Sequence, residues 1–276
     1  MNGGKKALLT LRYLAVVLAM GILLLPIYWI FLNSIKTNAQ AASVPPLWFF
    51  EPDLSHYITI FTSAKFDLRE AMFNSLVVSV GATALALALS FTTAYSLSRY
   101  KTGGRSFALW ILSFRMLPPV VFVIPMYILF VKYGLVDTQL GLILLYLIFN
   151  IPITVWILRS FIDDIPKDFE EAAIVDGCTP TQAMLKIVFP LSTPGLVASA
   201  IVCFIFSFNE FIFAYIFTQS NAVTMPAMAA IFIGRYTYEW ADLSASIMVM
   251  TIPMVIFSFL VQRWLVRGLT MGAIKG

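Results

Sequence analysis

Six apolar stretches, each of 22–26 residues, dominate this sequence. A helix of about 20 apolar residues crosses a hydrocarbon core about 30 Å thick, so stretches of this length predict membrane spans. The predicted spans are residues 11–32, 72–97, 108–131, 140–161, 196–218 and 243–265. Little sequence remains for a separate soluble domain. We therefore predict an all-α membrane protein with six transmembrane helices, which form one membrane domain over residues 1–276.

The first apolar stretch also has features of a signal peptide, because Lys5, Lys6 and Arg12 lie at its start. However, the apolar region of a signal peptide is only roughly 7–15 residues long. The small-residue triplet 39–41, which resembles a cleavage site, lies well past the end of the stretch. We expect this segment to be retained as a membrane span.

Positive charge is distributed unequally between alternate connections. With a cytoplasmic N-terminus, the inside segments hold twelve Lys and Arg residues: Lys5, Lys6, Arg12, Arg99, Lys101, Arg105, Arg159, Lys167, Lys186, Arg263, Arg267 and Lys275. The outside connections hold five: Lys36, Lys65, Arg69, Lys132 and Arg235. This excess obeys the positive-inside rule and predicts a multi-pass protein with both termini cytoplasmic. Topology thus explains the net charge of +4, and no nucleic-acid partner is expected.

The sequence offers few residues for catalysis or metal binding. His56 is the only histidine, and Cys178 and Cys203 are the only cysteines, so neither a metal site nor a disulfide framework is expected. The phosphate-binding pattern G-x-x-x-x-G-K-[ST] is absent. We predict a chain that is not an enzyme, binds no cofactor or metal of its own and hydrolyses no nucleotide.

Two long outside connections contain clusters of aromatic residues. Residues 48–50 form one cluster, and Tyr236, Tyr238 and Trp240 form the other. Two interpretations stay open at this point. Such residues form belts at the membrane surface, and they also serve as docking surfaces for external partners.

Two spans carry signals of helix packing or bending. Gly81, Ala84 and Ala88 recur at helical spacing and predict close approach of a second helix. Pro118 and Pro119 remove backbone donors inside the third predicted span. An interruption of this kind is tolerated where protein or a water-filled cavity satisfies the backbone. The third span is therefore either a kinked structural helix or a helix that lines a cavity.

The inside connection, residues 162–195, predicts a helix, a turn and a second short helix. Pro166 suits the first turn of the first helix, and the acids that follow it lie near the positive helix end. Gly177 is a natural C-terminal stop. Thr179 then begins a T-x-x-Q capping box for the second helix, which should end near Phe189 because Pro190 follows.

Two helices this short need a surface to pack on. One hypothesis places them on the inner leaflet, where bound helices are rich in Lys and Arg because the leaflet is anionic. Residues 163–176 instead contain six acids and one Lys. We therefore favour a cytoplasmic protein partner.

The same connection resembles the EAA motif of binding-protein-dependent ABC importer permeases. The residues that carry the resemblance are Glu171, Ala172, Ala173, Gly177, Ile187 and Pro190. Phe189 is a departure, because the family usually has Leu before the proline. Residues 209–211 and the tail 268–276 are similar to carbohydrate-importer permeases of the maltose type. The resemblance extends roughly from Asn74 to the C-terminus.

This resemblance implies the function and the partners. It implies a permease subunit in a bacterial or archaeal cytoplasmic membrane, which forms half of the path for a sugar, oligosaccharide, disaccharide or polyol. The implied partners are a second permease subunit, an extracytoplasmic sugar-binding protein and a cytoplasmic ATPase dimer that binds ATP and Mg²⁺. Glu170 and the motif residues would dock on the ATPase, and Gly272, Lys275 and Gly276 of the tail 266–276 would reach its dimer interface.

Two alternatives to a sugar importer remain. One is an importer of the same kind for a non-sugar solute, such as an amino acid or a peptide. The other is a secondary transporter, which the absence of evident repeats and the scarcity of ionisable residues in the spans disfavour. The spans contain only Arg115 and Glu210 as deep ionisable residues.

Glu210 is the residue most difficult to place in a membrane. It lies about 15 residues into its predicted span, and an ionisable group there costs a few kcal/mol unless it faces water or a partner. Arg115 is a candidate partner, and an interhelical hydrogen bond is the alternative. Asn209 and Asn150 add neutral groups suited to sugar hydroxyls. We predict that these four residues line the translocation path.

Overall fold

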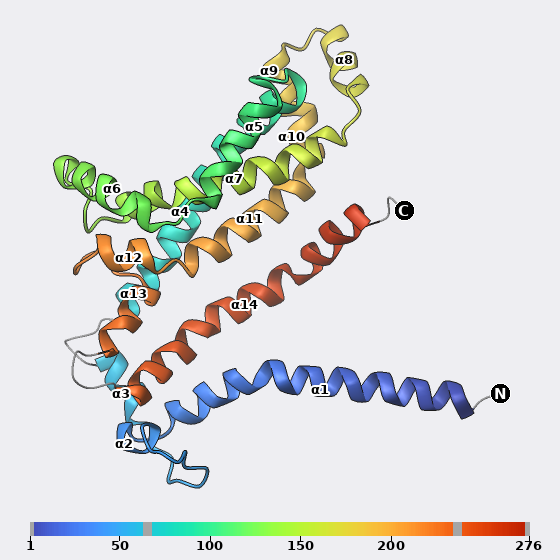
Figure 1. Ribbon diagram of the computed structural model, residues 1–276. Helices are drawn as coiled ribbons and strands as arrows, with labels where there is room; N and C mark the ends of the chain where they lie inside the picture. The colour runs from blue at the N-terminus through green and yellow to red at the C-terminus, as the bar shows by residue number, and fades with distance from the viewer. Residues whose placement is uncertain (1–2, 63–67, 234–238, 274–276) are drawn as a thin grey trace. The chain divides into compact units, whose positions relative to one another are not determined.

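The computed structural model describes residues 3–62, 68–233 and 239–273, and every regular element in these ranges is helical. The elements are α1 (Gly3–Ser34), α2 (Asn38–Ala41), α3 (Ser55–Thr62), α4 (Leu68–Arg99), α5 (Gly104–Ser113), η1 (Phe114–Met116), α6 (Val120–Tyr133), α7 (Gln139–Asp163), α8 (Asp168–Val175), α9 (Pro180–Ala183), η2 (Met184–Val188), α10 (Phe189–Leu191), α11 (Thr193–Phe208), α12 (Ile212–Phe217), α13 (Met225–Ala229), η3 (Ala230–Phe232) and α14 (Trp240–Ala273) (Figure 1). The predicted all-α membrane fold is confirmed.

Four described helices are long and apolar enough to cross a membrane: Leu8–Ser34, Leu68–Arg99, Gln139–Asp163 and Trp240–Gln262. Two further pairs of helices qualify together, although each pair is bent, so the number of spans rises to six if each pair is one span. One pair, Gly104–Met116 with Val120–Tyr133, bends by 90°. The bend occurs at Pro118 and Pro119, which cannot donate the N–H groups that would continue the first helix.

The predicted fifth span, residues 196–218, is not one continuous helix. α11 ends at Phe208 and α12 begins at Ile212. With 16 residues, α11 is about 24 Å long, which is shorter than a typical hydrocarbon core. On its other side, α11 is bent by 73° from the preceding helical stretch Pro180–Leu191.

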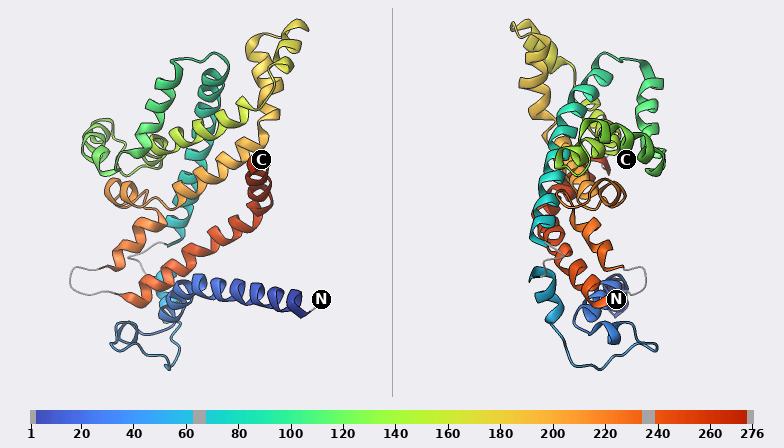
Figure 2. Two further views of the ribbon diagram at one scale, coloured as in Figure 1. Left: turned by 45° about the vertical axis from the view of Figure 1, so that its right-hand side comes forward. Right: turned by 90° about the vertical axis from the view of Figure 1, so that its left-hand side faces the viewer.

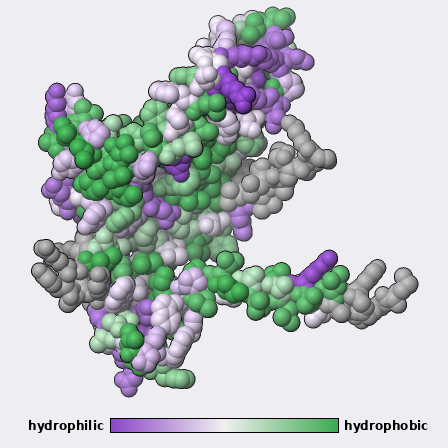
Figure 3. All heavy atoms as spheres, viewed as in Figure 1, coloured by the Kyte–Doolittle hydropathy of each residue, from purple (hydrophilic) through white to green (hydrophobic). Residues whose placement is uncertain are grey.

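The chain divides into two compact units, Met1–Leu68 with Ala229–Ile252 and Arg69–Met228 with Pro253–Gly276. In the first unit, the Asp242 carboxylate accepts a 2.8 Å hydrogen bond from Asn38 Nδ2 and lies 2.8 Å from His56 Nδ1. This cluster joins α2 and α3 to the start of α14. The surface of α1 is covered with exposed apolar side chains (Figure 3), as expected of a helix that contacts lipid or another subunit.

Lys36 is a buried cation in the first unit. It is only 1% exposed, and its Nζ lies 4.9 Å from the ring centre of Trp29 and 5.0 Å from that of Phe50. Its hydrogen-bond acceptor is Asn33 Oδ1, at 3.4 Å. Burial lowers the pKa of the Lys36 ammonium.

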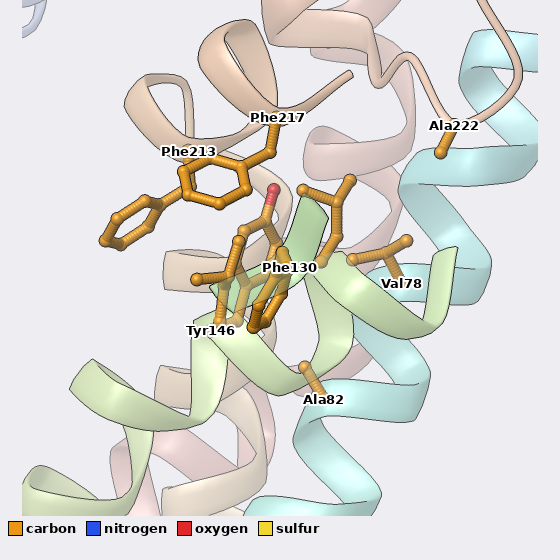
Figure 4. Packing of buried hydrophobic residues seen from close by; sticks show 9 residues of the cluster. Val78, Ala82, Phe130, Tyr146, Phe213, Phe217 and Ala222 are labelled. Carbon is orange, nitrogen blue, oxygen red and sulfur yellow. The ribbon is translucent and has the colours of Figure 1, made fainter. Parts of the chain in front are cut away.

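The second unit is built around α4 and α7. Figure 4 shows Val78 and Ala82 of α4 beside Tyr146 of α7, with Phe213 and Phe217 of α12 packed over them. All five side chains are buried. This cluster fixes the position of α12 after the interruption of the fifth span.

Close approach of α4 to α7 occurs at Gly81, as predicted. A Cβ atom there would lie 2.7 Å from Ile143 Cδ1. Ala84 and Ala88 are exposed, however, and do not belong to this contact. The small residue that continues the buried stripe from Ala82 is Ala86, because positions four residues apart share a helix face.

Asp137 fastens two connections of the second unit to each other. Its carboxylate accepts hydrogen bonds from the backbone N–H groups of residues 219–222, at 2.9–3.2 Å. Desolvation raises the pKa of the Asp137 carboxyl, but these four backbone donors outweigh it, so the pKa is lowered. Asn74 of α4 supports the same connection by donating to the carbonyl groups of Asn221 and Val223.

Candidate functional site

The first candidate site is the connection of residues 162–195, which we call the coupling segment. Its helices α8 and α9 lie together, beyond the ends of α7 and α10 (Figures 1 and 2). Polar residues gather on α8, whereas apolar residues dominate the helices of the spans (Figure 3). The predicted helix, turn and second helix are confirmed, but α8 begins at Asp168, so Pro166 precedes the helix and does not lie in its first turn.

The turn after α8 is a Schellman motif, in which two backbone hydrogen bonds close the helix end. The Cys178 N–H donates to the Ala173 carbonyl and the Gly177 N–H donates to the Ile174 carbonyl. Gly177 has a φ of +92°, in the region that side-chain-bearing residues rarely adopt. The predicted stop at Gly177 is therefore confirmed, and Gly177 sets the direction in which α9 leaves.

The second helix begins as predicted but ends later. Thr179 and Gln182 form the reciprocal capping box, with hydrogen bonds of 2.9 and 3.3 Å. The helical path ends at Leu191, two residues after the expected Phe189, so Pro190 does not stop it. The path continues through the π-helical segment η2. Pro190 follows the π segment directly, and the Phe189 N–H before it donates to the Met184 carbonyl in the π register.

Glu170 anchors α8 to the end of α4. Its carboxylate is buried and accepts hydrogen bonds from Tyr95 Oη, at 2.7 Å, and from Arg99 Nε. Arg99 Nη2 donates in addition to the Ile165 carbonyl, at 2.9 Å. The side chains of Arg99 and Glu170 are only 7% and 8% exposed. Glu170 thus faces the interior of the protein, where it holds the coupling segment in place.

The opposite face of α8 is open. Glu171, Ala172 and Gly177 are exposed, as is Val175, which is 87% exposed. Of the other motif residues, Ala173 is buried, Ile187 is half-buried and Pro190 is exposed. Apolar and acidic side chains alternate over this open face, because Phe169, Ile174, Asp168 and Asp176 are exposed as well.

The second candidate site is a cavity of about 320 Å³ in the second unit. Its wall includes three of the four residues predicted for the translocation path, namely Arg115, Asn150 and Glu210. The remaining wall residues are Leu117, Pro119, Tyr146, Phe149, Phe206, Ser207 and Phe213. We call this space the polar cavity. The interruption of the third span, at Leu117 and Pro119, therefore lies in a cavity wall.

Glu210 explains the interruption of the fifth span. Its carboxylate accepts the backbone N–H groups of Phe213, at 3.1 Å, and Ala214, at 3.2 Å. These are donors of the first turn of α12, which have no partner within the helix. Glu210 is half-buried, so one carboxylate both caps α12 and borders the polar cavity.

Arg115 and Glu210 do not form an ion pair with each other in the described chain. The Arg115 guanidinium lies 4.2 Å from the ring centre of Phe206, and its Nη1 donates weakly to the Phe149 carbonyl, at 3.4 Å. Asn209 does not line the cavity; it is exposed, and its Nδ2 donates to the Ile205 carbonyl.

Asn150 is held by a residue that sequence reasoning did not select. Its Nδ2 donates to Ser207 Oγ at 2.8 Å, and both residues are buried. The Tyr146 hydroxyl is also buried at the cavity, where it interacts with the Glu210 carboxylate. In the sequence, Ser207 and Tyr146 stand out only as polar residues inside apolar stretches. Such residues are common in membrane spans, so this feature does not identify a cavity wall.

The described residues contain no group of three His, Cys, Asp or Glu side chains that could hold a metal ion. The last predicted contacts lie in the tail. Gly272 belongs to the end of α14, whereas Lys275 and Gly276 lie outside the described residues.

Comparison with known proteins places these features in a family. The chain is 36% identical over 266 residues to the trehalose transport system permease protein SugB of Mycobacterium tuberculosis, covering 94% of this chain and 95% of the relative. It is 32% identical over 269 residues to the sulfoquinovosyl glycerol transport system permease protein SmoH of Agrobacterium fabrum, covering 96% of this chain and 94% of the relative.

A solved structure has the same fold. It is a chain of a bacterial ABC transporter involved in the import of the acidic polysaccharide alginate, with a TM-score of 0.74 and 20% identity. The match covers 95% of this chain and 98% of that chain. Residues 84–271 match the family described as the inner membrane component of binding-protein-dependent transport systems. The chain belongs to this family of ABC transporter permeases, as its EAA-like coupling segment predicted.

Proposed function

We propose that this chain is the permease subunit of an ATP-driven importer and forms half of the path for a sugar, oligosaccharide, disaccharide or polyol. The observation that carries the proposal is the coupling segment, whose helix α8 is anchored on one face by Glu170 and open on the other. Relatives named as trehalose and sulfoquinovosyl glycerol permeases support a carbohydrate substrate.

In this proposal, the open face of α8 docks on a cytoplasmic ATPase dimer, which binds ATP and Mg²⁺. Exposed Phe169 and Val175 supply apolar contact area, and exposed Glu171 supplies a charge for a basic groove. The residues proposed to transmit the movement are Glu170, Glu171, Ala172, Ala173, Gly177, Ile187 and Pro190. Both termini are then cytoplasmic, and the tail residues Gly272, Lys275 and Gly276 reach the ATPase.

A second permease subunit completes the path, and an extracytoplasmic binding protein delivers the substrate. The polar cavity contributes to that path. Arg115, Asn150 and Tyr146 offer hydrogen-bonding groups, while the rings of Phe149 and Phe206 offer apolar faces. Sites of this composition favour a polyhydroxylated solute, because buried polar groups left unmatched are penalised.

Purification tests the proposal directly. The tagged chain, expressed with its neighbouring genes, should retain an ABC ATPase and a second permease in detergent. The reconstituted complex should take up a radiolabelled sugar only with ATP and binding protein. Uptake of amino acids or peptides but not sugars would refute the proposed carbohydrate substrate. Uptake driven by an ion gradient without an ATPase would refute the proposed ATP-driven import.

The tail gives a separate test. Deletion of residues 271–276 should lower substrate-stimulated ATPase activity without lowering the amount of protein in the membrane. Undiminished transport after the deletion would remove Gly272, Lys275 and Gly276 from the proposed ATPase contact.

A further inference from the structure

A second, larger pocket lies away from the polar cavity and from the open face of α8. It has a volume of about 710 Å³ and lies between the last turn of α4, the start of α5 and the end of α7. The wall consists of Leu97, Ser98, Lys101, Gly104, Arg105, Ala108, Leu109, Trp156, Arg159, Ser160, Asp163 and Asp164. We call it the basic pocket.

The basic pocket has a gradient of polarity along two of its walls. On α5, Arg105 comes first, and Ala108 and Leu109 lie further along the helix. On α7, which runs the opposite way through the pocket, Trp156 comes about 10 Å before the helix end, and the charged residues follow it. α7 is long and apolar enough to cross a membrane, and α5 qualifies together with α6 as a bent pair. With both helices crossing the membrane, the charged end of the pocket would lie at the membrane surface and the apolar end within the membrane.

The charges at the polar end are not balanced within the chain. Asp163 is already engaged, because it accepts a hydrogen bond from Ser98 Oγ and lies 3.5 Å from Arg159 Nε. Lys101 and Arg105 are exposed and form no ion pair with any described residue. The pocket wall thus holds three cations, Lys101, Arg105 and Arg159, against the two carboxylates of Asp163 and Asp164, so its net charge is positive.

We infer that the basic pocket binds an anionic phospholipid, with the phosphate on Lys101 and Arg105 and an acyl chain against Leu109 and Trp156. Guanidinium and ammonium groups are the usual partners of phosphate. Basic pockets between membrane helices on the cytoplasmic side are known to suit anionic headgroups. The apolar wall favours a lipid over a free phosphate, since only a lipid can contact Leu109 and Trp156 with the same molecule whose headgroup the cations bind. Leu109 is 47% exposed and Trp156 is 46% exposed.

The bound lipid would pack against three elements close to the coupling segment. Ser98 and Asp163 bind each other at this pocket, and the neighbouring Arg99 holds Glu170 of α8. Occupancy of the pocket is therefore expected to stabilise the attachment of α8 to α4. This inference does not depend on the transported solute.

Native mass spectrometry of the full chain in detergent, titrated with phosphatidylglycerol, tests the inference. The variant Lys101→Gln/Arg105→Gln should bind this lipid about 30-fold more weakly at its tightest site, since each cation near a membrane surface contributes roughly a factor of five. The matched control Lys132→Gln/Lys186→Gln removes two exposed cations elsewhere and should bind as the unmodified chain does. Equal binding by the two double variants would overturn the inference.

Three further arms identify the ligand. Phosphatidylcholine should not occupy the tightest site, and its binding there with the affinity of phosphatidylglycerol would refute an anionic headgroup. Inorganic phosphate and glycerol 3-phosphate should not displace the lipid at equal concentration, and displacement by either would reduce the pocket to a simple anion site. Trp156→Gln, which keeps all cations, should also weaken lipid binding, and unchanged binding would refute the acyl-chain contact. Thermal melting of each variant without lipid shows that it is folded.

Discussion

Arg99 and Glu170 form a buried ion pair although they lie 71 positions apart in the sequence. Arg99 is the last residue of α4, and Glu170 lies in the first turn of α8. The pair therefore joins a membrane span directly to the coupling segment. A displacement of α8 must either move the end of α4 or break this pair.

The first prediction concerns this pair. Arg99→Met should destabilise the protein by about 3–5 kcal/mol, because it leaves the Glu170 carboxylate buried without its counter-charge. The double variant Arg99→Met/Glu170→Met should be more stable than either single variant, since no buried charge then remains. Thermal melting in detergent measures both effects. Glu171→Gln is the control, because Glu171 is exposed and its replacement should leave the melting temperature unchanged. Equal melting of Arg99→Met and Glu171→Gln would contradict the anchoring role.

The second prediction concerns Gly177. Gly177→Val should uncouple ATP hydrolysis from uptake while the protein stays in the membrane. No atom lies within 4 Å of a Cβ added at Gly177, so the effect must come from the backbone, where a positive φ costs a side chain about 1–2 kcal/mol. Gly177→Asn should retain more coupling than Gly177→Val, because Asn tolerates positive φ. Parallel assays of uptake and ATPase activity measure the ratio. Identical losses in the two variants would show that backbone strain is not the cause.

The third prediction concerns acid stability and Asp137. Its folded pKa is lowered, so its contribution is fully present above the ordinary Asp value of about 3.9 and is lost as the pH falls through the lower folded value. Asp137→Asn keeps the shape and tolerates the φ of +58°, but it should lower stability at pH 7 by at least about 1 kcal/mol. The stability difference from the unmodified chain should shrink as the pH falls below about 4. Melting curves across pH measure this, and a difference that stays constant with pH would refute the role of the charge.

The fourth prediction concerns Lys36. Its folded pKa is lowered by burial, so the unfolded chain binds the proton more tightly and stability rises with pH up to the ordinary Lys value of about 10.4. Lys36→Met should remove this rise, and it should stabilise the protein or leave it unchanged at neutral pH, because a desolvated charge is replaced by an apolar side chain of similar length. Denaturation followed between pH 7 and 10 tests the sign of the stability change. Clear destabilisation of Lys36→Met at pH 7 would mean that the cation–ring contacts contribute more to stability than burial of the charge costs.

The fifth prediction concerns the polar cavity. Glu210→Cys, in a background without the native cysteines, should react with a small hydrophilic maleimide, and ATP trapping should change the rate. Ala214→Cys, in the helix α12 that Glu210 caps, is the matched control and should stay unreactive, because Ala214 is fully buried. A Cys at position 210 that remains unreactive in both states would place Glu210 in a sealed helix contact and remove it from the path.

The parts of the coupling segment that depend on neighbouring residues could be predicted from the sequence. The Thr179–Gln182 capping box and the Gly177 turn each lie within a few residues, and both are present. Anchoring by Arg99 could not be predicted, because a contact across 71 positions leaves no local pattern. Glu170 and Glu171 were both predicted to contact the ATPase, although adjacent helical positions point about 100° apart and cannot share one surface.

The interruptions of the spans were predictable to different degrees. Pro118 and Pro119 predict the bend in the third span, because a proline lacks the N–H group that a helix needs, whatever the surrounding residues are. The end of α11 at Phe208 has no proline or glycine beside it. Glu210 begins a new helix there by accepting the N–H groups of Phe213 and Ala214. The sequence did not predict this cap, because an acid in an apolar stretch was interpreted either as facing a cavity or as forming an interhelical hydrogen bond. Pro190 gave the opposite error: a helix end was predicted before it, but the helical path continues through it because the preceding π segment accommodates the proline.

The closing turn of α8 has one more consequence, which is chemical. Cys178, whose amide completes that turn, has a partly accessible free thiol, whereas the thiol of Cys203 is buried against Thr154 at 2.8 Å. Alkylating reagents should therefore select Cys178 in the unmodified chain. A fluorophore attached there would report the movement of the turn during transport, with no engineered residue in the protein.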